Sequence, residues 1–217
     1  MKVIVTGATG MVGEGVLHEC LLHPEVEGVL VINRKPCGIK DSKLSEIILP
    51  DFFDLSGIQV QLAGYDACFF CLGVSSVGLS ENEYTRLTHT LTLHLASALI
   101  VQNPGMVFCY ISGAGTDSTE KGRSRWARVK GRTENDLMKL PFKKVFLFRP
   151  GFIEPGPGLK NTLRSYNYFF WLIPIIRRLA PNWICTLKEI GLAMIHTVLK
   201  GYDKNVLEVS DIKKLAQ

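Results

Sequence analysis

The 217-residue sequence has no apolar run of the ~20 residues that a membrane-spanning helix requires. Its short N-terminal apolar stretch enters a glycine-rich turn at once, unlike a secretory signal peptide. We find no internal repeat, low-complexity tract or long linker. It also lacks a strong excess of charge: 21% of residues are charged, which is ordinary for a globular protein, and the net charge of +5 is modest. Lysines and arginines are spread along the chain, with a small cluster at Lys121–Lys130. We therefore expect no integral membrane segment and no nucleic-acid partner, and an anionic small molecule is the favoured ligand.

The sequence also offers no convincing metal site. Cys68 and Cys71 form a C-x-x-C pattern, but they lie in an apolar run that predicts a buried strand, where residues three apart face opposite sides. His89 and His94 are five apart, a poor spacing for a shared metal on a helix. The six cysteines are typical of core residues in a reducing compartment, so we expect a cytoplasmic protein without a metal.

What the sequence does have is a glycine-rich turn between a strand and a helix. Val3–Val5 is a β-branched run, as in a strand buried on both faces, and a helical apolar stripe begins at Val12. Such a turn directs backbone N–H groups and the positive helix end at one point, which suits a pyrophosphate. The alternative is a structural turn without a ligand. The candidate cofactor-binding residues here are Thr6, Gly7, Thr9, Gly10, Met11, Val12 and Gly13.

Strand and helix patterns alternate along the whole chain, which predicts a parallel sheet with helices on both faces. We expect an α/β, Rossmann-like doubly wound fold, in a single NAD(P)-binding domain over 1–217. A small substrate or lid element is expected at 159–185. The expected later strands are Val29–Asn33, Glu46–Leu49, Ala67–Leu72, Met106–Ile111, Lys144–Phe148 and Asn205–Val209, and the expected later helices are Glu81–Gln102, Ser124–Glu134 and Thr186–Leu199.

The end of the second strand indicates which dinucleotide binds. In NAD-selective folds an acidic residue there holds the ribose 2′-hydroxyl, and this chain has Asn33, Arg34 and Lys35 instead. A guanidinium can grip a 2′-phosphate bidentately or stack on adenine. We therefore expect NADP rather than NAD, the alternative being solvated charges in a surface turn.

The spacing Thr-Gly-x-x-Gly-x-x-Gly resembles that of the extended and atypical short-chain dehydrogenase/reductases. Within them the chain is similar to small NADP-binding proteins related to the Tat-interacting oxidoreductase, and to the NAD-dependent epimerase/dehydratase-like proteins. The resemblance covers Met1–Gly158 well and the remainder loosely. It implies an acidic residue near the adenine amino group, for which we choose Asp51, with Asp54 as the second choice, although Asp51 equally suits an Asx turn or helix cap. Phe52 beside it is also expected to contact the cofactor. It also implies that Pro150, Gly151, Phe152 and Ile153 line the nicotinamide end.

The end of the fourth strand should also line the cofactor. In open α/β sheets ligands bind beside the carboxyl ends of the strands, at the point where strand order reverses. We expect backbone atoms of Cys71, Leu72 and Gly73 there, although Gly73 is equally explained by turn chemistry.

The resemblance implies a catalytic serine and a Tyr-x-x-x-Lys pair, and only part of this set is present. Ser112 would orient the substrate, the alternative being that Ser112-Gly113 only closes the strand. Lys130 would hold the nicotinamide ribose, the alternative being a surface ion pair with Glu134. Four residues before Lys130 stands Trp126, and no tyrosine occurs between Tyr110 and Tyr166. An indole does not exchange a proton usefully.

Three explanations of the missing tyrosine stay open. The protein binds NADP without turnover, or another residue (Tyr110, Tyr166 or Tyr168) supplies the proton, or a water held by Ser112 does so. The aromatic segment 163–184 suits simple packing, a lid over an apolar substrate, a homodimer or protein-partner face, or a membrane-surface patch. The first hypothesis is an NADP-dependent oxidoreductase acting on a small apolar carbonyl or alcohol; the alternatives are a non-catalytic NADP-binding sensor or scaffold and a nucleotide-sugar epimerase.

Overall fold

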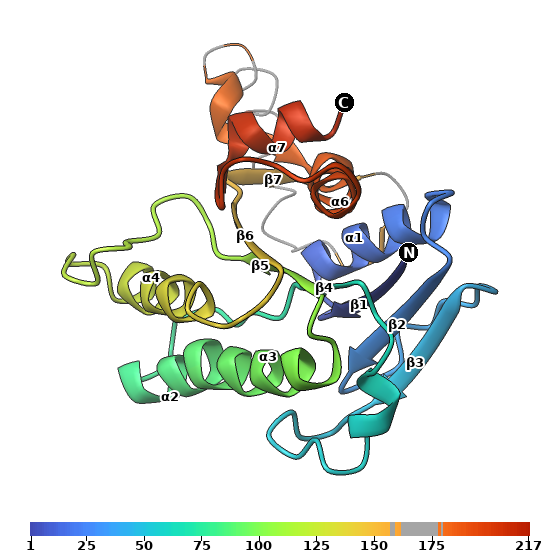
Figure 1. Cartoon of the computed structure of the whole chain (residues 1–217). Helices are drawn as coiled ribbons and strands as arrows, with labels where there is room; N and C mark the ends of the chain where they lie inside the picture. The colour runs from blue at the N-terminus through green and yellow to red at the C-terminus, as the bar shows by residue number, and fades with distance from the viewer. Residues whose placement is uncertain (157–158, 162–177, 179) are drawn as a thin grey trace.

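A seven-stranded parallel sheet forms the centre of the computed structural model, which describes residues 1–156, 159–161, 178 and 180–217 (Figure 1). The strand order is β3-β2-β1-β4-β5-β6-β9, and every neighbouring pair is parallel. The order reverses between β1 and β4. The strands are β1 Lys2–Thr6, β2 Gly28–Asn33, β3 Leu44–Ile48, β4 Ala67–Phe70, β5 Val107–Ile111, β6 Lys144–Arg149 and β9 Val206–Glu208.

Helices cover both faces of this sheet, so the predicted doubly wound, Rossmann-like α/β fold is confirmed (Figure 1). One face packs against α1 Met11–Leu22, α6 Leu187–Lys200 and α7 Val209–Leu215, and the other against α3 Leu91–Gln102 and α4 Arg125–Leu137. The short helix α2 Glu81–Thr85 lies on the same side as α3 and contacts α4. Val3, Ile4 and Val5 of β1 have no exposed surface, because the strand is central and covered on both sides.

Two local features differ from expectation. The single helix predicted over Glu81–Gln102 contains a π-helical turn at Arg86–Thr90, between α2 and α3. Two short strands, β7 Phe152–Glu154 and β8 Ile184–Thr186, pair in a separate two-stranded sheet that the sequence analysis did not anticipate. They are only three residues long and lack a pattern that distinguishes them from loop. The described residues also form two short 3₁₀ turns, η1 Gln59–Leu62 and η5 Pro181–Trp183.

The cysteines lie as the strand pattern predicted. Cys68 belongs to the apolar layer beneath α3, whereas Cys71 packs against the layer beneath α1 and α6, so the C-x-x-C pair points to opposite faces. All six thiols are free. Within the described ranges, no group of three or more His, Cys, Asp or Glu side chains is placed to hold a metal ion.

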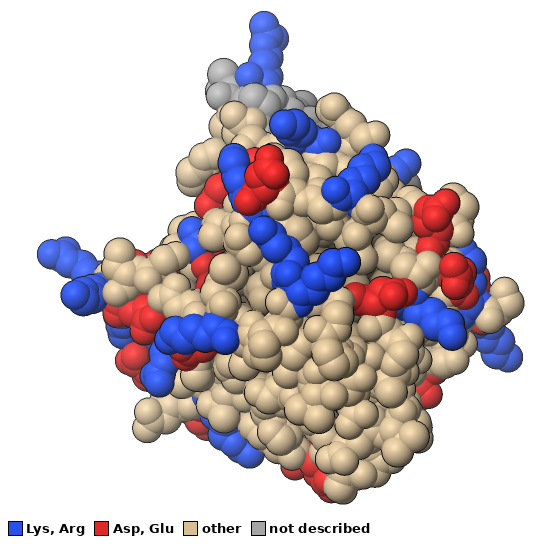
Figure 2. Space-filling model, viewed as in Figure 1, with Lys and Arg blue, Asp and Glu red and all other residues tan. Residues whose placement is uncertain are grey.

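Charged side chains of both signs lie over the upper half and the edges of the face shown in Figure 2, and the lower central part of this face carries few charges. In the part of the chain that the structure describes, no helix has the length and apolar character needed to cross a bilayer. Residues 162–177 and 179 lie outside the described part, and with them most of the predicted aromatic segment, including Tyr166 and Tyr168.

Candidate functional site

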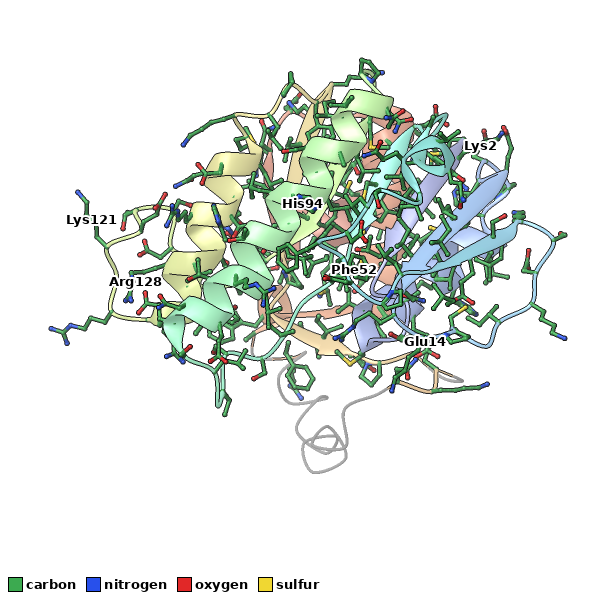
Figure 3. All side chains as sticks on the ribbon, turned by 90° about the horizontal axis from the view of Figure 1, so that it is seen from below. Lys2, Glu14, Phe52, His94, Lys121 and Arg128 are labelled. Carbon is green, nitrogen blue, oxygen red and sulfur yellow. The ribbon has the colours of Figure 1, made fainter. Side chains whose placement is uncertain are left out.

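The predicted site residues follow the carboxyl ends of neighbouring strands. In a parallel sheet these ends share one edge, and the reversal of strand order between β1 and β4 opens a crevice there. In Figure 3, Lys2, at the start of β1, is at the upper right, and Glu14, in the first turn of α1, is at the lower right. The glycine-rich turn therefore lies at the Glu14 end.

Two glycines of the turn leave no room for a side chain. Gly7 has φ +73°, and a Cβ there would lie 2.9 Å from the carbonyl carbon and oxygen of Cys71. A Cβ at Gly13 would lie 2.1 Å from the carbonyl oxygen of Gly7, so α1 starts in direct contact with the turn. The backbone N–H of Gly10 donates to the carbonyl oxygen of Gly7 at 2.9 Å and closes the turn. Both glycines are thus required by the packing of the turn itself.

Gly10 differs from these two. A Cβ at this position would meet only the carbonyl oxygen of Gly7, at 3.4 Å. Gly10 is the N-cap of α1, has no side chain to cap the helix, and is exposed together with Thr9. The N-terminal N–H groups of α1 consequently face an open surface, the geometry that binds anions.

Thr6 and Asn33 are buried polar residues beside the turn. Thr6 is fully buried, and its hydroxyl has no hydrogen-bond partner among the described residues. The Asn33 carboxamide oxygen accepts the Ala8 N–H at 3.1 Å, and its amide group lies 3.4 Å from Glu46 Oε1. The Asn33 side chain, which we predicted to contact the cofactor, therefore stabilises the glycine-rich turn. Arg34 and Lys35 beside it are exposed.

A cavity of about 210 Å³ lies between this edge and the segment formed by the π-helical turn and the first residue of α3. Five predicted cofactor residues line it: Arg34, Asp51, Phe52, Leu72 and Gly73. The Asp51 Oδ1 accepts the Phe53 N–H at 2.9 Å, so the residue forms the Asx turn, and it also lines the cavity. Its contact with adenine stays a prediction. The other lining residues, which the sequence analysis missed, are Pro50, Phe53, Val74, Arg86, Leu87 and Leu91.

Cys71 lies outside the lining of this cavity. Its backbone contacts Gly7, as the Cβ distances show, and burial raises the pKa of its thiol far above the usual value. Because the Cys71 thiol is neutral and its backbone packs against the turn, Cys71 has a structural role beside Gly7.

Ser112 does not present a free hydroxyl. Its Oγ lies 2.6 Å from Glu134 Oε1 and 3.1 Å from the carbonyl oxygen of Phe148, and one hydroxyl proton serves these acceptors. Glu134 is 1% exposed and also accepts from Arg149, through Nε at 3.0 Å and through Nη2. Arg149 Nη2 further contacts Ser118 Oγ at 2.6 Å. Ser112 is thus part of a buried ionic network that ties β5, α4 and β6 together.

Lys130 lies beside the same strand end. It is 8% exposed, its ammonium donates to the carbonyl oxygen of Ile111 at 3.0 Å, and it sits 4.9 Å from the centroid of the Tyr110 ring. Burial lowers its pKa from 10.5 to about 8, against the opposing influence of nearby Glu134. The alternative of a surface ion pair with Glu134 is wrong, because Lys130 is buried and Glu134 pairs with Arg149.

The indole of Trp126 occupies the approach to this strand end. Cβ atoms added at Gly113 and Gly115 would meet it at 3.9 and 3.7 Å, so the ring packs on the loop after β5. Tyr110, considered as a substitute proton donor, has no exposed surface, and burial raises the pKa of its phenol. Its hydroxyl has no partner among the described residues and faces the interior. Tyr110 therefore cannot reach a substrate.

The residues predicted for the nicotinamide end follow β6. The carbonyl oxygen of Pro150 accepts the Ala114 N–H at 2.8 Å, and a Cβ at Gly151 would lie 2.3 Å from the carbonyl oxygen of Trp183. Phe152 and Ile153 lie in β7, with Ile153 buried. The loop after β5, the end of β6 and η5 are thus in contact, while a role in cofactor binding stays a prediction.

Glu14 is a buried residue that the sequence analysis did not single out. Its carboxylate accepts the N–H groups of Lys160 and Asn161 at 2.8 and 2.7 Å. The first turn of α1 is thereby fastened to the chain that follows β7. A glutamate in an otherwise apolar helix stripe, four residues after the N-cap, was the only signal in the sequence.

Comparisons with known proteins agree with this architecture. Residues 3–123 match the model of the NAD dependent epimerase/dehydratase family. "Protein fmp52-1, mitochondrial" of Aspergillus oryzae is 30% identical over 211 residues, covering 92% of this chain and 87% of that protein. "Protein fmp52, mitochondrial" of Emericella nidulans is 27% identical over 215 residues, with 94% and 90% coverage. These names overturn the expectation of a cytoplasmic protein; composition and cysteine environment carry no targeting address.

Solved structures share the fold at low identity. The UDP-N-acetylglucosamine 4-epimerase of Methanobrevibacter ruminantium has a TM-score of 0.66 at 18% identity, covering 94% of this chain and 74% of that chain. The Bordetella bronchiseptica enzyme WbmG, solved in complex with NAD, has a TM-score of 0.68 at 12% identity, with 100% and 77% coverage. Together with the matched family model, the glycine turn and the strand order, they identify the chain as a member of the NAD dependent epimerase/dehydratase family, with the Rossmann-like fold of the extended short-chain dehydrogenase/reductases.

Proposed function

We propose that the protein binds NADP(H) along the carboxyl edge of the sheet. The observation that carries this proposal is that two neighbouring features suit two neighbouring parts of the dinucleotide. An uncapped helix N-terminus opens beside Gly10, and the cavity next to it is lined by Arg34 without an ion-pairing carboxylate among the described residues. The first feature suits a pyrophosphate and the second a 2′-phosphorylated adenosine.

We further propose an oxidoreductase of the atypical short-chain type, acting on a small, apolar carbonyl or alcohol. NADP(H) would supply or accept the hydride. Lys130 would hold the nicotinamide ribose, and its lowered pKa of about 8 would let it exchange a proton near neutrality. Ser112 would act mainly through the Glu134–Arg149 network that fixes the end of β5.

The second candidate is a binding protein that holds NADP(H) without turnover. A specific observation favours it: Trp126 packs on the loop after β5, the Ser112 hydroxyl lies against Glu134, and Tyr110 is buried. None of these three groups can pass a proton to a substrate in this arrangement.

Substitution of Trp126 separates the two candidates. We would measure NADPH affinity by calorimetry and NADPH oxidation with a panel of aldehydes, ketones and quinones, for the wild type, Trp126→Tyr and the matched control Trp126→Phe. Turnover by the wild type supports the oxidoreductase. Binding without turnover, with activity appearing only in Trp126→Tyr, supports the binding protein. Failure of the wild type to bind NADPH contradicts both candidates.

The names of the relatives support a mitochondrial location for this chain. Fractionation of cells expressing the tagged full-length protein tests it, and recovery of the protein with soluble cytosolic markers alone would contradict it.

A further inference from the structure

Two arginines from separate parts of the chain line the cavity at the adenosine end. Arg34 follows β2, and Arg86 is the first residue of the π-helical turn between α2 and α3. Both are exposed, and in the described part of the chain neither has a carboxylate within ion-pair distance. Asp51 is the only acidic residue in the lining, so the cavity carries two cationic groups and one anionic group.

Arg86 is held in place by an aromatic ring. Its guanidinium carbon lies 4.7 Å from the centroid of Phe53. The Phe53 ring also lies 6.0 Å from the ring of His94 on α3, and the Phe53 N–H is bonded to Asp51. A guanidinium stacked on a ring uses its face for that contact, and the N–H groups at its edge stay available to an anion.

The rest of the lining suits a flat apolar group. Leu72, Val74, Leu87 and Leu91 surround the volume of about 210 Å³. A ligand that combines a ring with a nearby phosphate ester would use both the apolar wall and the unpaired cations. A pre-positioned guanidinium loses little freedom on binding such a ligand, which favours affinity.

We infer that Arg86, stacked on Phe53, is a second binding residue for the 2′-phosphate of a 2′-phosphorylated adenosine, acting together with Arg34. This inference rests on the proposed NADP(H) function and assigns its dinucleotide selectivity to two arginines instead of one. Phe53 is a positioning residue, because it acts through Arg86.

The test compares ligands that differ by the 2′-phosphate. Calorimetry would measure NADPH against NADH, and 2′,5′-ADP against 5′-AMP, for the wild type, Arg34→Gln, Arg86→Gln and Phe53→Leu. Arg123→Gln is the matched control, since Arg123 is exposed and close in sequence to Lys121, which Figure 3 places at the edge of the molecule far from Phe52. Circular dichroism would establish that every variant is folded.

We expect Arg86→Gln and Arg34→Gln each to weaken NADPH and 2′,5′-ADP by about tenfold or more, and NADH and 5′-AMP by less than about twofold. Phe53→Leu should give a smaller loss in the same direction, and Arg123→Gln none. If Arg34→Gln removes the preference for NADPH while Arg86→Gln leaves it intact, the inference is overturned and the proposed function stands. If the wild type binds neither dinucleotide, or binds NADH as tightly as NADPH, both fail.

Discussion

The glycine turn allows one prediction that separates folding from binding. Gly13 and Gly10 both lie where α1 begins, but a Cβ at Gly13 would be 2.1 Å from the carbonyl oxygen of Gly7, whereas one at Gly10 would be 3.4 Å from it. The first contact is with backbone, which cannot rotate away, so the turn or the helix must shift. Overpacking of this kind costs about 1–3 kcal/mol, more than the ~1 kcal/mol that alanine gains over glycine inside a helix.

We therefore expect Gly13→Ala to be destabilised and Gly10→Ala to unfold near the wild-type midpoint. For a chain of this size each kcal/mol corresponds to roughly 2–4 °C in Tm. Urea titrations followed by circular dichroism would give the free energies of unfolding. The new methyl group of Gly10→Ala covers the open helix N-terminus, so this variant should lose NADPH affinity while it stays folded. The reasoning is refuted if Gly13→Ala matches the wild type in urea, or if Gly10→Ala unfolds early.

Three further predictions concern the buried polar groups. Glu134→Gln removes the buried charge that pairs with Arg149, and we expect urea titrations to show a loss of about 3–5 kcal/mol in the free energy of unfolding. The control Glu208→Gln should change it little, because this carboxylate is 3.6 Å from Arg149 and 52% exposed. Equal losses for the two variants would contradict this prediction. Asn33→Ala leaves the buried Ala8 N–H without its acceptor and should cost about 1–3 kcal/mol, whereas the exposed Asn82→Ala should cost little. Burial lowers the pKa of Lys130 from 10.5 to about 8, so between these values the unfolded chain holds more protons and the wild type should gain stability relative to Lys130→Met as pH rises. Urea midpoints of both proteins at pH 7.5 and pH 10 would check it, and a constant difference would show that Lys130 titrates normally.

The sheet and its layers were predictable because each strand is a short apolar run and each helix carries its own pattern. Val3–Val5 and Ala67–Phe70 illustrate this: both are buried on two faces, and both read as continuous apolar stretches. The helix expected from Thr186 also begins there, with a capping box between Thr186 and Glu189 whose three-residue spacing can be read from the sequence.

Contacts between individual side chains were harder to predict from the sequence. That Arg34, Asp51 and Gly73 line one cavity could be predicted, because the ends of parallel strands meet at one edge of the sheet. The position of Arg86 in the same cavity could not, because no sequence pattern indicates the widened turn at Arg86–Thr90. Nor did the sequence show that Ser112 would bond to Glu134. That contact depends on Arg149, 15 residues further along, which places the carboxylate.

The packing of α1 against α6 bears on how the polypeptide acquires its structure. A Cβ at Gly15 would lie 2.7 Å from Leu187 Cβ, and one at Gly191 would lie 2.7 Å from Glu19 Cγ, so the two helices touch almost without intervening side chains. The matched family segment, residues 3–123, therefore ends before the helix that shelters its own first helix. Expressed alone, that segment would lack the helix that packs against Gly15, Val16 and Glu19 of α1. Autonomous folding is expected only when synthesis has passed Lys200, and closure between such distant partners makes assembly slow.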